Sequence, residues 1–303
     1  MMPSFRDGIR AAGQAIPPLA ILFFASCCTH PPKPPVGYWG PTDPMTMVVA
    51  KVNANNSAIP TLYARQEIQA DLYDKSRNKS FYVNSSGDVF LRKPRELLLR
   101  GRHDLAGKIF EIGSTDEVFW FTVYGNQDER YWGHYRNLGK PCMEEMPVRP
   151  DLIGEVLGIT EINTNLLEPP FPTMRFNHDA DAYMLIWNAR LPTQYYAEKE
   201  IWYDRKTLLP LKVIIYDFNG RVLVRANLGN HRPVEVANQP KENWPKIATN
   251  YSLMFPQSKS TMVLKLSDMA LVSKTGHPRA GTIVFKDDPE VSKVIQVDAA
   301  CEK

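Results

Sequence analysis

Short stretches in which apolar and polar residues alternate dominate the chain from about residue 61 onward. A period of two is typical of half-buried β-strands, whereas helices repeat their apolar positions every three to four residues. The pattern therefore predicts a mainly β protein. The expected strands are residues 61–73, 79–92, 95–103, 107–113, 117–124, 129–135, 195–204, 209–218, 221–231, 247–255, 261–273 and 281–286.

Helical signals are few. Asp43 and Pro44 are typical of an N-cap followed by a first-turn proline, and an apolar stripe with helical spacing continues from there to about Asn55. Residues 151–157 and 180–188 are the other expected helices. Two or three helices thus accompany about a dozen strands.

One hairpin can be aligned residue by residue. Asn219-Gly220 is a strong two-residue hairpin signal, because both positions tolerate positive φ. The predicted pairs are Phe218 with Arg221, Ile215 with Val224, Val213 with Ala226 and Leu211 with Leu228, and on the alternate face Lys212 with Asn227 and Ile214 with Arg225. The second, third and fourth of these pairs are apolar, so this sheet has one buried face and one wetter face.

Two further turns are expected. Ser86-Gly87-Asp88 predicts a turn that joins residues 79–85 to 89–92, and residues 204–207 predict another hairpin loop. Consecutive antiparallel strands of this kind form a meander that curls into a barrel or half-barrel.

The amino terminus has the pattern of an export signal. A basic start leads into a short apolar run that ends at Phe24, and this run is too short to span a bilayer. Ala25 and Ser26 then precede Cys27, and this arrangement resembles the bacterial lipobox, although Phe24 stands where that pattern usually has Leu. We expect Cys27 to carry acyl chains such as palmitate. The alternative is an ordinary cleaved signal with an incidental cysteine.

The segment after Cys27 is rich in proline. Residues 29–44 contain six prolines and two glycines, a composition that favours extended geometry over a packed core. We expect a signal peptide over residues 1–26, a tether over 27–44 and one folded domain over 45–303. The alternative for the tether is an extension without a role.

Charge and cysteine content narrow the possible partners. The formal net charge is +3 over 303 residues and the basic residues are scattered, so the chain shows no nucleic-acid footprint. Export would permit a disulfide between Cys142 and Cys301, while Cys28 lies beside the expected anchor.

The order of several segments resembles that of the LolA/LolB-like outer-membrane lipoprotein-sorting superfamily, particularly its lipid-anchored members. The segments are IPTLYA at 59–64, GDVFLRKP at 87–94, LLLRG at 97–101, FEIGS at 110–114, EVFWF at 117–121, IWYD at 201–204 and YDFNG at 216–220. The resemblance covers most of residues 45–275. It implies a single curved antiparallel sheet that forms an incomplete, half-open barrel, with two or three helices covering the open side and an apolar cavity for acyl chains.

The hairpin register identifies candidate cavity residues. We expect the acyl cavity to be lined by Leu211, Val213, Ile215, Val222 and Val224, together with Phe119 and Phe121 from the expected strand 117–124. The apolar loop 166–171 is a candidate for the exposed hook of LolB-type receptors.

Signals of catalysis are weak. None of the six histidines has a partner at zinc-motif spacing, and the sequence contains no HExxH or GxSxG motif. Residues 177–181 offer one imidazole and two carboxylates, as a metal site or as a polar turn that caps the following helix. Residues 131–135 are either an aromatic sugar-binding surface or an ordinary packed strand, and Cys142 lacks an evident base. We therefore expect neither an enzyme nor a bound cofactor or metal.

Two functions remain open. The favoured one is a lipid-anchored carrier or acceptor that binds the acyl chains of lipids or lipoproteins, located in the cell envelope at the outer membrane and facing the periplasm. The alternative is a structural or interaction lipoprotein whose barrel is filled by its own side chains. An empty apolar cavity favours the first, and a core packed to native density favours the second.

Overall fold

The computed structural model describes residues 37–302 apart from 75–77, 126–127, 139, 141, 144–148, 272–282 and 287. The chain divides into two units, Met1–Val36 and Gly37–Lys303, and the described residues all belong to the second. The expected signal peptide, the expected acylation site Cys27 and most of the expected tether therefore lie outside the described residues.

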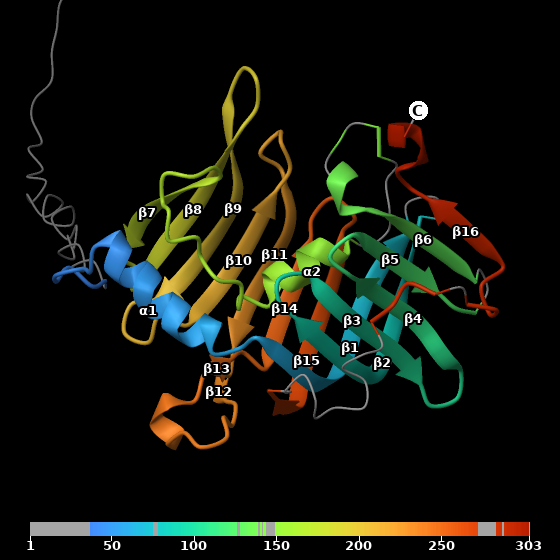
Figure 1. Ribbon diagram of the computed structural model, residues 1–303, viewed down its shortest axis with the longest axis horizontal. Coiled ribbons are helices and arrows are strands. Elements are labelled where there is room, and N and C mark those ends of the chain that lie inside the picture. The colour runs from blue at the N-terminus through green and yellow to red at the C-terminus, as the bar shows by residue number, and fades with distance from the viewer. Residues whose placement is uncertain are drawn as a thin grey trace, which may run out of the picture. The chain divides into compact units, whose positions relative to one another are not determined.

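The second unit is built on one curved, unclosed sheet of 14 strands (Figure 1). Its order is β16-β6-β5-β4-β3-β2-β1-β15-β14-β11-β10-β9-β8-β7, and every neighbouring pair is antiparallel except β16 with β6. The strands are β1 (Thr61–Asp74), β2 (Lys79–Arg92), β3 (Glu96–His103), β4 (Gly107–Ser114), β5 (Val118–Val123), β6 (Glu129–His134), β7 (Phe171–Asn177), β8 (Ala182–Arg190), β9 (Tyr195–Asp204), β10 (Pro210–Tyr216), β11 (Val222–Gly229), β14 (Asn250–Phe255), β15 (Ser260–Ala270) and β16 (Lys293–Gln296). The predicted mainly β, half-open barrel is confirmed.

Short elements complete the described part of the chain. The helices are α1 (Met45–Ser57), α2 (Pro150–Val156) and the 3-10 helices η1 (Tyr135–Asn137), η2 (Lys241–Asn243) and η3 (Ala299–Glu302), and β12 (Arg232–Pro233) pairs with β13 (Lys246–Ile247) in a small second sheet. Both α-helices lie on the same side of the large sheet (Figure 1). We call the face they cover the inner face and the opposite one the outer face.

The β10–β11 hairpin has the predicted register. Residues 212–215 pair with residues 227–224, in the register that the alternation of apolar and polar residues predicts. The turn itself differs, because Gly220 adopts φ of 77° and donates its N–H to the carbonyl of Asp217, so the loop closes with a bulge. The predicted pair of Phe218 with Arg221 is therefore replaced by a hydrogen bond from the Asp217 N–H to the carbonyl of Arg221.

The turn expected at Ser86-Gly87-Asp88 is wrong, since β2 runs through these residues without interruption. Gly87 lies opposite Gly101 of β3, and a Cβ on Gly87 would come within 1.9 Å of the Arg100 carbonyl oxygen. The glycine therefore permits a close approach between two strands and does not form a turn.

The helix expected over residues 180–188 is also wrong. These residues form most of β8, whose burial alternates, and Asp181 at φ of 49° lies in the tight turn that precedes it. A nearly continuous apolar run does not distinguish a buried strand from a buried helix. Its partner β7 was missed because prolines surround it, yet β7 is an edge strand where Pro172 removes no ladder hydrogen bond that the sheet needs.

Helix α1 begins where expected but is capped differently. The carbonyl of Pro44 accepts hydrogen bonds from the backbone of Met47 and Val48, while the Asp43 carboxylate pairs with Lys51 instead of capping the helix. The buried face of α1 packs into the main hydrophobic cluster on the inner face of the sheet. Helix α2 contacts β4 and β5 on one side and β10 on the other, so the sheet curves enough for one short helix to reach both halves.

The outer face is covered only in part, by a C-terminal segment that comprises residues 283–302. Residues 283–286 were expected to be a strand, but they run without sheet pairing, and Ile283 and Phe285 pack against Phe90, Leu98 and Trp120. This second hydrophobic cluster lies on the opposite side of β2–β5 from the main one.

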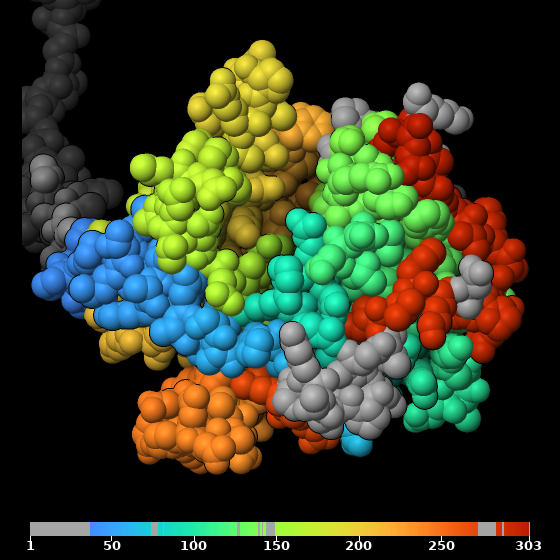
Figure 2. Space-filling view, viewed as in Figure 1, coloured from blue at the N-terminus to red at the C-terminus, as the bar shows by residue number. Residues whose placement is uncertain are grey.

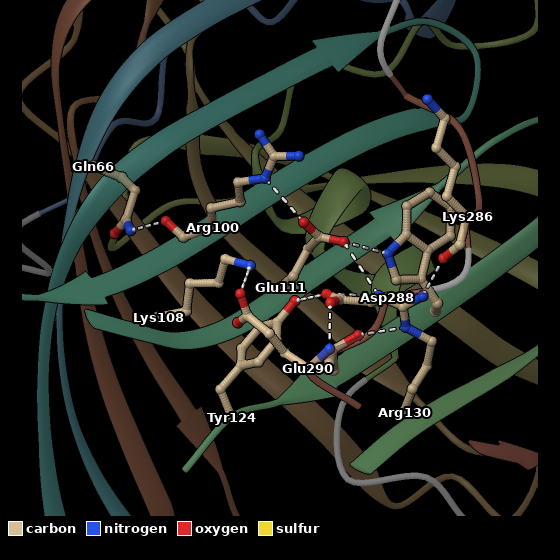
Figure 3. A network of polar contacts seen from close by, with 11 residues as sticks. Gln66, Arg100, Lys108, Glu111, Tyr124, Arg130, Lys286, Asp288 and Glu290 are labelled. Atoms are coloured by element: carbon tan, nitrogen blue, oxygen red, sulfur yellow. Dashed lines mark hydrogen bonds and ion pairs between the residues drawn. The ribbon is translucent and has the colours of Figure 1, made fainter. Parts of the chain in front are cut away.

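A buried polar network fixes the same segment (Figure 3). Arg130 donates to the Thr122 hydroxyl at 2.8 Å and lies 3.6 Å from Asp288 and 3.9 Å from Glu111. Glu111 also accepts hydrogen bonds from Arg100 and from the indole of Trp120, each at 2.9 Å. The network joins four strands, β3 to β6, to the C-terminal segment.

The end of the chain is held by a disulfide and a buried carboxylate. The possible disulfide between Cys142 and Cys301 is formed. Asp298 is completely buried and accepts hydrogen bonds from the Asn137 amide, the backbone N–H of His134 and Gln296, and it also contacts the His134 ring nitrogen at 2.9 Å. Burial alone would raise the pKa of Asp298, but these hydrogen bonds hold it well below its usual range.

Candidate functional site

A pocket opens on the inner face of the sheet. Strands β8 and β9 form one side of it, and the irregular chain that follows α2 forms the other. Its volume is about 170 Å³. The lining residues are Thr160, Glu161, Ile162, Asn163, Glu168, Pro169, Pro170, Trp187, Lys199 and Ile201. Figure 2 shows that this face of the unit is hollowed, with gold-coloured residues from the β9–β10 region at the floor of the hollow.

Residues 157–170 cover one side of this pocket, and we call them the cover segment. Asn53 of α1 clamps the segment, because its side chain accepts a hydrogen bond from the Ile162 N–H at 2.8 Å and donates one to the Ile162 carbonyl at 2.7 Å. Asn56 donates to the Thr160 carbonyl at 2.9 Å. The cover segment has no helix or strand of its own, so these side-chain bonds and the burial of Leu157, Ile159 and Ile162 hold it in place.

The wall opposite the cover segment is apolar at one end and charged at the other. Trp187 and Ile201 are buried, while Lys199 pairs with Glu155 of α2 at 2.7 Å and lies 5.0 Å from the Trp187 ring centre. Burial raises the pKa of the neighbouring Glu198 carboxyl, and the Lys199 charge opposes that shift.

The other charged groups of the pocket are also paired. Lys93 lies 3.4 Å from Glu161, and burial lowers the pKa of Lys93 against the attraction of that carboxylate. Glu168 accepts a hydrogen bond from Asn163 at 2.8 Å. Each of these charged groups therefore has a polar partner within the pocket region.

None of the predicted cavity residues lines the pocket. Phe119, Phe121, Val213, Ile215 and Val224 are buried by the protein's own side chains, and Leu211 and Val222 are half-buried.

The register nevertheless connects two of them to the pocket wall. Val213 of β10 pairs with Ile201, and Ile215 pairs with Lys199. The apolar inner face therefore continues from the pocket into the predicted region, and contact of an acyl chain with these residues stays a prediction.

Sequence reasoning missed the pocket wall itself. Trp187 was placed on a helix that does not exist, so its position opposite Lys199 on a neighbouring strand could not be seen. The signal that could have found the wall is the alternation of Lys199, Ile201 and Tyr203 along β9, a segment that the family resemblance had already singled out.

The loop considered as a hook lies at the pocket edge. Leu167 is 84% exposed, next to the pocket-lining residues Glu168 and Pro169. The Asn165 side chain accepts a hydrogen bond from the Leu167 N–H at 3.3 Å, and the Asn165 carbonyl accepts one from the Glu168 N–H at 3.1 Å. A tight turn thus presents one apolar side chain to solvent beside the pocket.

The polar cluster at residues 177–181 has other contacts. His178 bonds through its ring nitrogen to the Tyr38 carbonyl at 2.7 Å, and its ring stacks on Trp39 with centroids 4.0 Å apart. Asp181 forms two hydrogen bonds with Arg205. The cluster therefore attaches residues 38–39, the end of the expected tether, to the folded unit.

A different group has metal-ligating side chains close together. Among the described residues, donor atoms of His134, Asp298 and Glu302 lie within 4.8 Å of one another. The Asp298 carboxylate already contacts the His134 ring and accepts hydrogen bonds from several other groups, so the arrangement is accounted for as the attachment of the chain end.

The aromatic residues near His134 pack against one another. The Trp132 ring lies 5.2 Å from Phe285, and Tyr135 lies 5.4 Å from Phe119. This arrangement favours the ordinary packed strand over the sugar-binding surface.

Comparisons with known proteins find similarity of the chain to solved structures alone. No family model matches it, and no curated protein matches its sequence. A solved structure of a LolA superfamily protein from Nitrosomonas europaea has 14% identity and a TM-score of 0.45, covering 75% of this chain and 93% of that one.

Two other solved structures are similar to about the same degree. A domain described as an outer membrane lipoprotein-sorting protein, from Vibrio parahaemolyticus, has 11% identity and a TM-score of 0.46, covering 78% of this chain and 95% of its own. A DUF1329 family protein from Desulfovibrio piger has 14% identity and a TM-score of 0.48, covering 79% and 97%. Within the described part of the chain, no helix is both long and apolar enough to cross a membrane.

Proposed function

We propose that this chain is a lipid-anchored protein of the cell envelope that binds acyl chains of a lipid or lipoprotein in the hollow of its curved sheet. The observation that carries the proposal is the inner-face pocket, whose apolar wall at Trp187 and Ile201 continues into the apolar strands β10 and β11. Burial of each methylene in such a site gains about 0.8 kcal/mol, so even part of an acyl chain binds usefully.

The pocket must enlarge to hold a whole chain. Its volume of about 170 Å³ is below the roughly 300 Å³ at which drug-sized ligand pockets begin. Residues 160–170 of the cover segment are the part that can move, because they lack regular structure and are attached mainly through Asn53, Asn56 and the buried Ile162. When the cover segment moves away, methylenes of the ligand take the place of its side chains against the inner face.

Two sequence features support an envelope location. Ala25 and Ser26 before Cys27 imply acylation at that cysteine, and the proline-rich residues that follow suit a tether. Replacement of Cys27 by Ser should abolish incorporation of labelled palmitate. Label that persists in this variant would contradict the anchor, unless Cys28→Ser then removes it.

The exposed Leu167 supports a role in exchange with a second lipid-bearing surface. An isolated leucine at the edge of a pocket can insert into a membrane or a partner cavity and there gain the free energy of burial. This interpretation makes the pocket and the turn at residues 163–168 parts of one site.

The decisive experiment measures lipid directly. The full chain carrying Cys27→Ser is purified and analysed by native mass spectrometry for co-purified lipid, then titrated with a fluorescent palmitoyl probe. Ile201→Phe, which narrows the pocket, should lower occupancy. Ile214→Phe is the matched control, because Ile214 lies on the alternate face of β10. Loss of binding in the control alone, or no lipid in the parent protein, would contradict the proposal.

A second candidate function rests on the packing of the predicted cavity. Val213 and Val224 have no exposed surface, and Ile215 is 6% exposed. A core filled in this way suits a structural or interaction lipoprotein without cargo. The same titration separates the two, since this candidate requires that the palmitoyl probe does not bind.

A further inference from the structure

Two tyrosine hydroxyls in the main core have no hydrogen-bond partner among the described residues. They belong to Tyr203 on β9 and Tyr251 on β14, and each side chain is 1% exposed. A buried hydroxyl without a partner is costly, so each one requires an explanation.

Tyr203 belongs to the strand that forms the pocket wall. Lys199, Ile201 and Tyr203 are alternate residues of β9 and share the inner face, and the first two line the pocket. Tyr203 is the next residue inward along this row.

The electrostatic surroundings of Tyr203 point to the same place. Burial raises the pKa of Tyr203, and the charge of Glu155 raises it further. Glu155 lies 2.7 Å from Lys199, which borders the pocket. The Tyr203 hydroxyl therefore stays protonated, as a hydrogen-bond donor that feels the charge of Glu155 and lies one position beyond the lining residue Ile201.

Tyr251 offers a natural comparison. It is equally buried, but it lies on β14, which β10 and β11 separate from β9. At roughly 4.8 Å per strand, about 14 Å separates the two strands. Burial alone raises the pKa of Tyr251, and no pocket residue lies beside it in the register.

We propose that the Tyr203 hydroxyl donates a hydrogen bond to the acyl carbonyl of the bound ligand, so that the site selects ester- or amide-linked acyl chains over plain hydrocarbon chains. This inference rests on the proposed function. The carbonyl then lies beside Tyr203, beyond Ile201, and the hydrocarbon follows the apolar row past Val213 and Ile215 of β10. A hydroxyl without a partner in the free protein is thus satisfied when ligand binds.

The test uses a pair of probes that differ only in the carbonyl. The full chain carrying Cys27→Ser is titrated with 1-palmitoylglycerol, an ester, and with 1-hexadecylglycerol, the corresponding ether. A neutral hydrogen bond gives an expected preference for the ester of about fivefold. Tyr203→Phe should bind both probes equally, while Tyr251→Phe keeps the preference.

Thermal unfolding supplies the second measurement. Both variants remove a hydroxyl that has no partner, so both should unfold at a higher temperature than the parent in the absence of ligand. The proposal is overturned if Tyr203→Phe retains the ester preference of the parent, or if the parent has none.

The outcomes also separate this inference from the function on which it rests. A parent protein that binds both probes with equal affinity keeps the proposed function and loses the role of Tyr203. A parent protein that binds neither probe loses both. Where the parent protein prefers the ester, its affinities for palmitoylglycerol and for an N-palmitoyl dipeptide are compared. The two ligands share the carbonyl and differ in the linkage, so the tighter one identifies ester or amide cargo.

Discussion

The two ends of the sheet bury their side chains in different ways. In β2–β5 the outer face carries Phe90, Leu98 and Trp120, all buried beneath the C-terminal segment, while the inner face is buried as well. In β9–β11 only the inner face is apolar and buried from solvent. There the outer face carries Lys212, which lies 3.7 Å from the ring of Trp202, and the exposed Arg225.

The difference assigns separate tasks to the two ends. The end that is buried on both faces is also fixed by a charged network and a disulfide, so it forms a rigid frame. The other end contains the pocket, and residues 160–170 of its cover segment are held by a few side-chain bonds and the buried Ile162. Segments with few buried contacts open at low free-energy cost, which suits an entrance for a ligand.

The largest expected effect is in the rigid end. Arg130→Met leaves Glu111 and Asp288 without their buried cation, and loss of one partner of a buried pair costs about 3–5 kcal/mol. Urea unfolding should show this loss. Arg225→Met on the exposed outer face of the other end should change stability by less than about 0.5 kcal/mol. Equal losses in the two variants would refute the contrast between the ends.

The disulfide should contribute nearly as much. Its cysteines are 159 residues apart in sequence, and loss of a native disulfide of this kind costs roughly 2–5 kcal/mol. The double variant Cys142→Ser/Cys301→Ser should therefore unfold at a lower denaturant concentration. Cys28→Ser serves as the control, and an unchanged midpoint in the double variant would show that the frame does not depend on the disulfide.

Acid should weaken the same end of the sheet. Because the pKa of Asp298 is lower in the folded than in the unfolded chain, its contribution to stability is complete above the unfolded pKa of about 3.9. That contribution is lost as the pH falls through the folded value. Denaturant midpoints measured between pH 6 and pH 2.5 should fall, and Asp298→Asn should flatten the curve. The same slope in both proteins would argue that other carboxylates dominate.

The clamp on the cover segment gives a smaller effect with a functional consequence. Asn53→Ala leaves the N–H and carbonyl of Ile162 without partners, at a cost of about 1–3 kcal/mol. If the cover segment controls entry, this variant binds the palmitoyl probe faster. Asn55→Ala is a close control, because Asn55 makes the same pair of bonds to Lys246, away from the pocket. Equal binding rates in the two variants would remove the cover segment from the mechanism.

The smallest effect on stability is expected at Leu167. Leu167→Ser changes a side chain that is 84% exposed, so the free energy of unfolding should move by less than about 0.5 kcal/mol. Transfer of bound palmitoyl probe to vesicles should nevertheless slow. Leu105→Ser, at a position 93% exposed in the β3–β4 turn, should leave transfer unchanged. Identical transfer in the two variants would show that Leu167 has no part in exchange.

The fold was largely predictable from alternation and turn chemistry. The β10–β11 register followed from Asn219-Gly220 together with the apolar pairs, since a shift by one residue would have turned every apolar side chain to the other face. Prediction failed where two structures share one pattern. The apolar run of β8 reads equally well as a helix, and Gly87 reads as a turn because its close approach to Arg100 is visible only in three dimensions.

The candidate site was much less predictable. The apolar face of the hairpin was found, but Trp187, Lys199 and the cover segment meet only through the pairing of β8 with β9 and the clamp from α1. Contacts between residues so far apart in sequence leave no local pattern. The unpartnered hydroxyl of Tyr203 likewise exists only in the packed core, because any exposed tyrosine binds water.

The position of the C-terminal segment determines the order in which the parts of this protein can fold. Strands β1–β6 can form a local meander early, yet their outer face and their β6 edge wait for residues 283–302, which are made much later. Strand β1 likewise pairs with β15, some 200 residues later. Such high contact order slows folding and leaves an apolar surface exposed until the whole chain is present. The newly made protein would therefore need protection from aggregation until residues 283–302 can pack onto the sheet.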